Sequence, residues 1–286
     1  MTRAQGDLSV TALYTSATWS WGGLPNAELV EHPRARAVFH AVNGALAVTR
    51  PFFGDEAPLR VALLHRHALI DGLLRASGYR RVLELAAGLS RRGITFTSDP
   101  AIEYVEVDRA NVIETKQALL ARAEAGRAAL ARSNLRLVAA DVTTARMDEL
   151  SPPDGTPLFV VAEGLLMYLM PDAQRSLARA VAERLAMGGG VFVFDFVPPS
   201  EQPASGVVGA GLEWLMTRFT GGESFARDPR TRAEVVNDLL ACGFDRVEAL
   251  EPREVAREWN LPHPEAATRQ LVFVAHVNHP KRREPS

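Results

Sequence analysis

Five acidic residues of this chain stand within or directly after short apolar runs: Glu84, Asp108, Asp141, Glu163 and Asp195. Successive members lie 22 to 33 residues apart, which is room for a strand, a crossover connection and the next strand. Parallel strands joined in this way bring their carboxyl ends to one edge of a sheet, where α/β proteins bind ligands. A row of carboxylates there favours a ligand that is rich in hydroxyl and amino groups or is cationic, and it would repel a bare polyphosphate.

A run of small residues follows the first of these acids. Glu84 and Leu85 lead into Ala86-Ala87-Gly88, and only small side chains let a ligand approach the backbone closely. The sequence therefore predicts that Glu84, Ala86 and Gly88 contact a cofactor. The dinucleotide fingerprint would have glycine in place of Ala86 and a third glycine at a spacing that is missing here, so the signal for NAD is poor. A tight strand-to-helix turn without a ligand is the alternative.

Asp108 stands 20 residues beyond Gly88, at the end of the second predicted strand. The two oxygens of a carboxylate can accept hydrogen bonds from both hydroxyls of a ribose. NAD and S-adenosylmethionine both carry that diol, so Asp108 indicates an adenosine-type ligand without choosing between them. A surface acid in a turn is the alternative reading.

The third and fourth predicted strands end in further candidate ligands of the cofactor. Asp141 and Val142 are placed to meet an adenine amino group through the carboxylate or the neighbouring backbone, although Asp141 would equally suit a helix N-cap. An ionised Glu163 would attract a sulfonium or an amino group, with a structural ion pair as the alternative. Gly164 permits an abrupt change of direction, and apolar residues then lead to Tyr168 on a wall facing cofactor or substrate.

Three motifs together resemble the leucine carboxyl methyltransferase family, and within it the bacterial branch named for the tetracenomycin polyketide O-methyltransferase. The resemblance covers roughly residues 60 to 197, and the motifs are 84–89 with Arg91, 104–108 and 163–169. It implies S-adenosylmethionine as the cofactor, and an arginine before the first strand that binds the cofactor carboxylate. Arg66 matches that position, with a solvated helix arginine as the alternative. The family usually has Gly-x-Gly where this chain has Ala86-Ala87-Gly88.

The segment before the first strand is expected to be mainly helical. Apolar periodicity over 59–74 predicts a helix that delivers the chain to the strand beginning near Arg80. The opening 11–17 also resembles the start of the family, which lies near the cofactor. If this segment folds back, Trp19 and Trp21 would cover the site. We therefore expect an N-terminal helical cap over 1–78 and a methyltransferase domain over 79–286.

The rest of the chain alternates strands and helices, which predicts an α/β protein. Helices are expected over 110–131, from Pro171, over 230–241 and briefly over 254–259, and two last strands over 246–250 and 271–277. By analogy, this order matches the Rossmann-like class I methyltransferase fold, with a seven-stranded, mostly parallel sheet, helices on both faces and an N-terminal helical extension.

An insertion over about 198–225 is expected to form a lid. Its apolar residues would make a surface suited to a planar or aliphatic small molecule, although packing against the core or another subunit is the alternative. They are Leu212, Trp214, Leu215, Met216 and Phe219. This composition favours a metabolite over a protein substrate.

Composition narrows the class of protein. The 286 residues are 47% hydrophobic and 23% charged, typical of a globular protein. With a net charge of −2 and a pI near 6.4, the chain has no overall positive charge that would attract nucleic acid or an anionic membrane. Cys242 is the one cysteine, so no intrachain disulfide forms and a cytoplasmic location is expected. The expected partners are a small-molecule substrate and, as one option, a second copy of the chain.

The expected activity is that of an S-adenosylmethionine-dependent O-methyltransferase that modifies a hydroxyl or carboxylate of a small metabolite, such as a polyketide-like compound. Tyr168 and His67 are candidate catalytic residues by position alone. No metal is expected, because His65 and His67 lie on different faces of the predicted helix. The alternatives are a protein C-terminal carboxyl methyltransferase, an NAD-dependent Rossmann dehydrogenase, and an inactive binding protein with a methyltransferase fold.

Overall fold

The computed structural model describes residues 8–49, 58–198, 228–266, 268 and 270–278. Nearly all of the predicted lid, with its apolar residues, lies outside these ranges. No helix in the described part is both long and apolar enough to cross a membrane.

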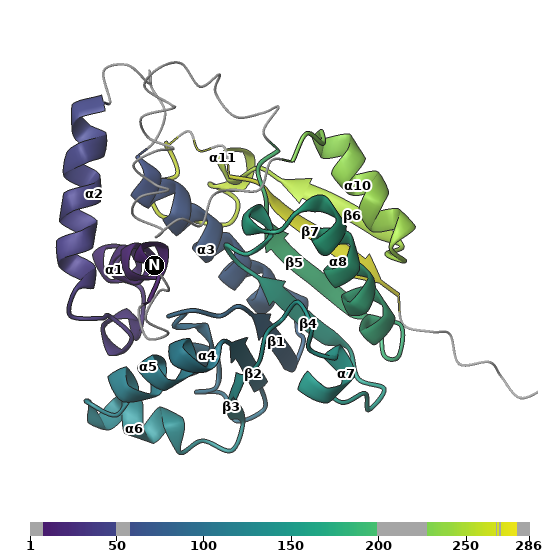
Figure 1. The fold of residues 1–286 in the computed structure, drawn as a ribbon, viewed down its shortest axis with the longest axis horizontal. Coiled ribbons are helices and arrows are strands. Elements are labelled where there is room, and N and C mark those ends of the chain that lie inside the picture. Colours follow the sequence, from purple (N-terminus) through teal and green to yellow (C-terminus); the bar gives the residue numbers. More distant parts are fainter. Residues whose placement is uncertain (1–7, 50–57, 199–227, 267, 269, 279–286) are drawn as a thin grey trace, which may run out of the picture.

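Seven strands form one sheet in the order β3-β2-β1-β4-β5-β7-β6 (Figure 1). β7 runs antiparallel to both of its neighbours, and the other pairs are parallel. This is the predicted class I methyltransferase sheet, and the fold prediction is confirmed. The strands are β1 (Arg81–Leu85), β2 (Glu103–Asp108), β3 (Leu135–Ala139), β4 (Leu158–Ala162), β5 (Gly190–Asp195), β6 (Arg246–Leu250) and β7 (Val272–Val277).

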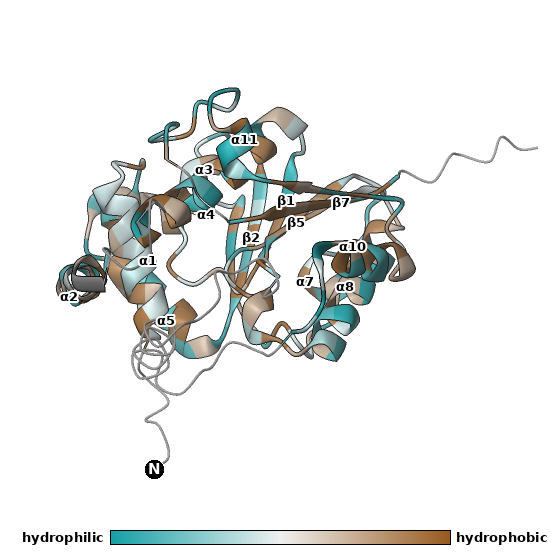
Figure 2. Cartoon of the chain, turned by 90° about the horizontal axis from the view of Figure 1, so that it is seen from above, coloured by the Kyte–Doolittle hydropathy of each residue, from teal (hydrophilic) through white to brown (hydrophobic). Residues whose placement is uncertain are grey.

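Helices cover both faces of the sheet, whose central strands are almost wholly apolar, as expected for parallel strands buried on both sides (Figure 2). One apolar core lies between the sheet and α7, α8 and α10, and a second lies between the sheet and α3 and α11. α4 follows β1, and α5 and α6 lie beside β2 and β3. The helices are α3 (Leu59–Ser77), α4 (Arg92–Phe96), α5 (Ala110–Leu120), α6 (Glu124–Leu130), α7 (Met147–Leu150), α8 (Pro171–Leu185), α10 (Arg232–Ala241) and α11 (Pro252–Val255).

The N-terminal segment adds a further helical layer, in which α1 (Val10–Trp21), η1 (Ala27–Leu29) and α2 (Ala35–Thr49) pack on the outer side of α3. Leu63 and Leu64 of α3 face this layer, whereas Ile70 and Leu74 belong to the core against the sheet. α3 therefore joins the first helices to the sheet and holds them above its carboxyl edge.

Two predicted helices differ in extent from those observed. The helix expected over 110–131 is divided into α5 and α6, because α6 turns back against the end of α5. A Cβ atom on Gly126 would lie 2.1 Å from the carbonyl oxygen of Leu120, so only glycine permits this approach. The helix expected over 254–259 instead starts at Pro252, which is suited to a first helical turn.

Candidate functional site

A cavity of about 380 Å³ lies at the carboxyl edge of the sheet, between the loops after β1 to β4 and the helices α1 and α3. All ten candidate site residues named from the sequence line it: Arg66, His67, Glu84, Ala86, Gly88, Asp108, Asp141, Val142, Glu163 and Tyr168. Four of the five acidic residues of the sequence pattern, all but Asp195, thus lie at or near strand ends that surround one space.

The turn after β1 forms one wall of this cavity. Ala86 has φ of +53° and Gly88 has φ of +54°, so both occupy the left-handed region. Glycine adopts this conformation freely, whereas a residue with a Cβ atom is disfavoured by roughly 1–2 kcal/mol. Ala86 is therefore strained at a point where backbone faces the cavity, and this is the position at which the family resemblance leads one to expect glycine.

Asp108 at the end of β2 is buried and tied to this turn. Its Oδ2 accepts a hydrogen bond from the backbone N–H of Gly88 at 2.7 Å, and its Oδ1 accepts one from the N–H of Arg109 at 2.7 Å. Burial raises the pKa of Asp108, and the two N–H groups oppose that rise. Each carboxylate oxygen of Asp108 can accept a further hydrogen bond from a ligand in the cavity. The alternative of an open surface acid does not fit this burial.

Asp141 closes a turn after β3. Its Oδ1 accepts hydrogen bonds from the backbone N–H and the hydroxyl of Thr143, at 2.9 and 2.6 Å, and these bonds lower the pKa of Asp141. The next helix, α7, begins only at Met147, so Asp141 does not serve as its N-cap. The neighbouring Val142 is buried and lines the same part of the cavity.

Glu163, directly after β4, is held by three basic side chains. Its Oε1 accepts a hydrogen bond from Arg66 at 2.9 Å, and its Oε2 pairs with His67 at 2.8 Å and with Arg92. Burial disfavours the carboxylate, but its electrostatic pairing with His67, Arg92 and Arg66 holds the pKa of Glu163 well below its ordinary value. Glu163 is therefore an ionised group inside an ion-pair network.

Arg66 is also part of this network and is not a solvated helix residue. Besides Glu163, it donates to Asp195 at the end of β5 at 2.7 Å, and only 4% of its surface is exposed. Two of its three guanidinium nitrogens are thus engaged by carboxylates. The fifth acid of the sequence pattern, Asp195, forms an ion pair with Arg66 and is fully buried.

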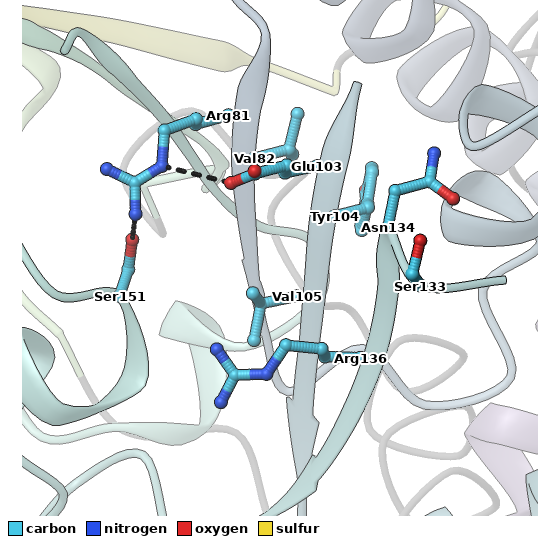
Figure 3. Close-up of a pocket in the computed structure, with 9 residues that line it drawn as sticks. All are labelled: Arg81, Val82, Glu103, Tyr104, Val105, Ser133, Asn134, Arg136 and Ser151. Atoms are coloured by element: carbon cyan, nitrogen blue, oxygen red, sulfur yellow. Dashed lines mark hydrogen bonds and ion pairs between the residues drawn. The ribbon is translucent and has the colours of Figure 1, made fainter. Parts of the chain in front are cut away.

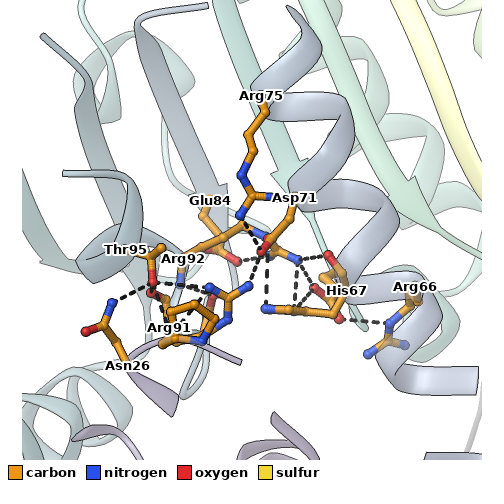
Figure 4. A network of polar contacts seen from close by, with 12 residues as sticks. Asn26, Arg66, His67, Asp71, Arg75, Glu84, Arg91, Arg92 and Thr95 are labelled. Carbon is orange, nitrogen blue, oxygen red and sulfur yellow. Dashed lines mark hydrogen bonds and ion pairs between the residues drawn. The ribbon is translucent and has the colours of Figure 1, made fainter. Parts of the chain in front are cut away.

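Arg92, the first residue of α4, was not among the candidates and lies at the centre of the network (Figure 4). It donates to Asp71 of α3 at 2.7 Å and to Glu84 of β1 at 2.7 Å, besides its contact with Glu163. Glu84 also accepts a hydrogen bond from the hydroxyl of Tyr104 at 2.8 Å. The four-residue spacing of His67 and Asp71, on one face of a predicted helix, is the sequence signal that indicates this network.

His67 is fully buried at the junction of α1, α3 and the loop after β4. Its ring stacks on Trp19 of α1 with 4.0 Å between centroids and an interplanar angle of 24°. Burial and the Arg92 guanidinium lower the pKa of His67, so we assign a neutral ring. Its Nδ1 lies 2.8 Å from Oε2 of Glu163 and 2.9 Å from a guanidinium nitrogen of Arg92, and the tautomer decides whether it donates to the first or accepts from the second. Among the described residues, its Nε2 makes no hydrogen bond, and Oδ1 of Asp71 lies 4.0 Å away.

α1 crosses the cavity opposite Tyr168. The hydroxyls of Thr11 and Tyr168 lie 3.4 Å apart, and Trp19 also lines the space. Of the two tryptophans expected to cover the site, only Trp19 does so. Trp21 is 41% exposed and stacks instead on His263.

A second cavity of about 160 Å³ lies at the opposite, amino ends of β1 to β3 (Figure 3). Its charged side chains are Arg81, Glu103 and Arg136. Arg81 pairs with Asp154 at 2.5 Å and with Glu103 at 3.5 Å, and it donates to the hydroxyl of Ser151 at 3.3 Å. This cavity contains none of the candidate site residues. Across the described ranges, no group of three His, Cys, Asp or Glu side chains is arranged to hold a metal ion.

Comparison with known proteins identifies the family. The sequence model of the leucine carboxyl methyltransferase family matches residues 30–182. A protein of Mycolicibacterium paratuberculosis assigned as an S-adenosyl-L-methionine-dependent methyltransferase is 31% identical over 280 residues, which cover 93% of this chain and 81% of the relative. A similarly assigned protein of Mycolicibacterium gilvum is 34% identical over 163 residues, 53% of this chain and 51% of the relative.

Solved structures agree on the fold. An O-methyltransferase family protein from Burkholderia thailandensis superposes with a TM-score of 0.52 at 10% sequence identity, covering 95% of this chain and 73% of that one. The dehydrogenase alternative is set aside by the family match. The chain therefore belongs to the leucine carboxyl methyltransferase family and is an S-adenosylmethionine-dependent methyltransferase.

Proposed function

We propose that this enzyme is an O-methyltransferase of the tetracenomycin type, acting on an oxygen of a small metabolite. The observation that carries the proposal is the course of α1 across the cavity, where Trp19 stacks on His67 and Thr11 meets Tyr168. A space of about 380 Å³ that is covered in this way suits a compact ligand better than an extended protein chain.

The residues of the cavity fit S-adenosylmethionine. Asp108 would hold the ribose hydroxyls, and Asp141 with Val142 would meet the adenine. The backbone of the turn at Ala86 and Gly88 would lie against the cofactor. The described ends of β1 and β4 carry carboxylates, which suit a ligand bearing a sulfonium and an amino group.

When bound, this cofactor supplies a methyl group whose transfer to an acceptor oxygen breaks the S–C bond, leaves its electron pair on sulfur and releases the proton of a hydroxyl acceptor to solvent. The chain itself would orient the acceptor and exclude water. His67 is fully buried and its Nδ1 is engaged by Glu163, so we assign it a positioning role toward Glu163. Tyr168 is the catalytic candidate that faces α1 across the cavity.

Titration calorimetry with S-adenosylhomocysteine and with NAD tests the cofactor assignment. We expect the first to bind and the second not to bind. Asp108→Asn should weaken S-adenosylhomocysteine binding by about 1–3 kcal/mol, because a charged acceptor of the ribose hydroxyls is lost. Glu114→Gln, at an exposed position of α5, is the matched control and should keep the wild-type affinity. Binding of NAD alone, or equal affinity in both variants, would refute the assignment.

A further inference from the structure

We propose that Lys116 of α5 is a positioning residue for the cofactor, because it holds the loop between β1 and α4 in the shape that the cofactor meets. Lys116 does not line the cavity and acts through two partners, the carbonyl of Ser90 and the carboxylate of Glu106. The inference rests on the proposed function, which places the cofactor against this loop.

The loop after β1 lines the cavity over residues 86–90. Its backbone is fixed by β2 and by a bond within the loop. The N–H of Ala87 donates to the carbonyl of Val107 in β2 at 3.0 Å, and the N–H of Ser90 donates to the carbonyl of Ala87 at 2.9 Å. The second bond closes a tight turn. The carbonyl of Ser90, at the end of this turn, is bonded by a group from outside the loop.

That group is the ammonium of Lys116. Its Nζ donates to the carbonyl oxygen of Ser90 at 2.5 Å and to a carboxylate oxygen of Glu106, in the middle of β2. Both charged side chains are fully buried. The hydroxyl oxygen of Ser90 accepts a hydrogen bond from the N–H of Arg92 at 3.2 Å. Ser90 thus ties the wall of the cavity to α5 on one side and to the start of α4 on the other.

The ion pair of Lys116 and Glu106 is buried at a cost that an apolar pair would not have. Burial raises the pKa of Glu106 to about 7, against the opposing charge of Lys116. Buried ion pairs often add no more stability than apolar side chains of similar size. The other buried residues of α5 are all apolar: Val112, Ile113, Leu119 and Leu120. The geometry of the loop therefore explains the buried ammonium better than the stability of the fold does.

Two variants separate positioning from stability. Glu106→Gln should lower the urea midpoint, because Lys116 stays buried without its counterion, but the ammonium still reaches Ser90. The double variant Lys116→Met with Glu106→Met leaves two uncharged side chains of similar length. Its urea midpoint should lie close to that of wild type and above that of Lys116→Met alone, which leaves Glu106 unpaired. In the double variant, the carbonyl of Ser90 has nevertheless lost its ammonium donor.

The affinity for the cofactor should therefore not follow the stability. Titration calorimetry with S-adenosylhomocysteine at pH 8, above the pKa of Glu106, measures the affinity of each variant. The double variant should bind about three- to tenfold more weakly than wild type, the loss expected for one hydrogen bond. Glu106→Gln should keep nearly the wild-type affinity. Gln117→Met, at an exposed position of the same helix, is the matched control and should change neither quantity.

The outcomes separate this inference from the proposed function. A double variant with wild-type affinity, a double variant no more stable than Lys116→Met, or a Glu106→Gln variant that binds as weakly as the double variant would overturn the role of Lys116. Asp108→Asn, measured alongside, tests the cofactor site itself. Wild-type affinity in Asp108→Asn, or a chain that does not bind S-adenosylhomocysteine at all, would overturn the proposed function.

Discussion

Arg92 joins three acidic residues that are far apart in the sequence. It is fully buried, and its guanidinium contacts Asp71, Glu84 and Glu163. Two of these carboxylates line the cavity, so the position of each depends on the same arginine. At the scale of single residues, the site is an ion-pair network whose carboxylates are fixed before any ligand arrives.

Removal of Arg92 should therefore be costly. Arg92→Met leaves buried carboxylates without their counterion and should destabilise the fold by about 3–5 kcal/mol. Urea unfolding followed by circular dichroism measures this change. Arg179→Met, at an exposed position of α8, is the control and should stay within about 0.5 kcal/mol of wild type. A loss in Arg92→Met as small as that of the control would show that the network is not a stabilising unit.

Substitution by glycine at two adjacent residues of the strained turn should change the free energy of unfolding in opposite directions. Ala86 has φ of +53°, whereas Ala87 is not among the residues with positive φ. Ala86→Gly should raise the free energy of unfolding by up to about 1 kcal/mol, because strain is relieved. Ala87→Gly should lower it by about 0.5–1 kcal/mol through the greater freedom of the unfolded chain. Thermal and urea unfolding of both variants check the signs; a loss of stability in Ala86→Gly would contradict the account.

The lowered pKa of the buried His67 should make the free energy of unfolding depend on pH. Burial and Arg92 lower its pKa in the folded chain, so the unfolded chain takes up the proton first when the pH falls below about 6.5. Its contribution is fully present above that pH and is lost below it, by at most about 1.4 kcal/mol per pH unit. His67→Gln should flatten the profile of unfolding free energy between pH 7.5 and 5.5. His40→Gln, at an exposed position of α2, should keep the wild-type profile; equal profiles in all three proteins would argue against a neutral buried His67.

At the scale of elements, α1 is the part that turns an open sheet edge into a covered cavity. Trp19 anchors it by stacking on His67 of α3, with 3% of its surface exposed. Trp21 ends the same helix but is 41% exposed. The covering of the site thus depends on one side of a helix that precedes the sheet by some sixty residues.

The two tryptophans allow a matched test. Trp19→Ala should destabilise the fold by about 3–5 kcal/mol, because a large buried ring is lost. Trp21→Ala should cost much less, since a good part of the ring already meets solvent. Urea unfolding compares the two directly. Equal costs would mean that the stacking of Trp19 on His67 does not anchor α1.

The first five strands of the sheet could be predicted because each is a short, largely apolar run that contains an acid or is followed closely by one. β4, for example, is buried along its whole length and is followed by Glu163. The break between α5 and α6 could not be predicted, because it depends on the contact of Gly126 with the end of α5. The role of Arg92 was also missed, since its contact with Glu163 spans 71 residues and requires the strand order to be known.

At the scale of the whole molecule, two apolar cores enclose the sheet and α3 links it to the N-terminal helices. We propose that residues 1–78 act as a helical cap on a methyltransferase domain over 79–286, with α3 as the shared element. This arrangement places the charged network between the cap and the carboxyl edge of the sheet, where the candidate site residues line one cavity.

The central claim is that the cofactor occupies this cavity, and a crystal structure with S-adenosylhomocysteine tests it most directly. The account predicts that the ligand lies at the carboxyl edge of the sheet, with its ribose hydroxyls hydrogen-bonded to Asp108 and its adenine beside Val142. A ligand bound elsewhere, such as in the cavity around Arg81 at the amino ends of the strands, would contradict it.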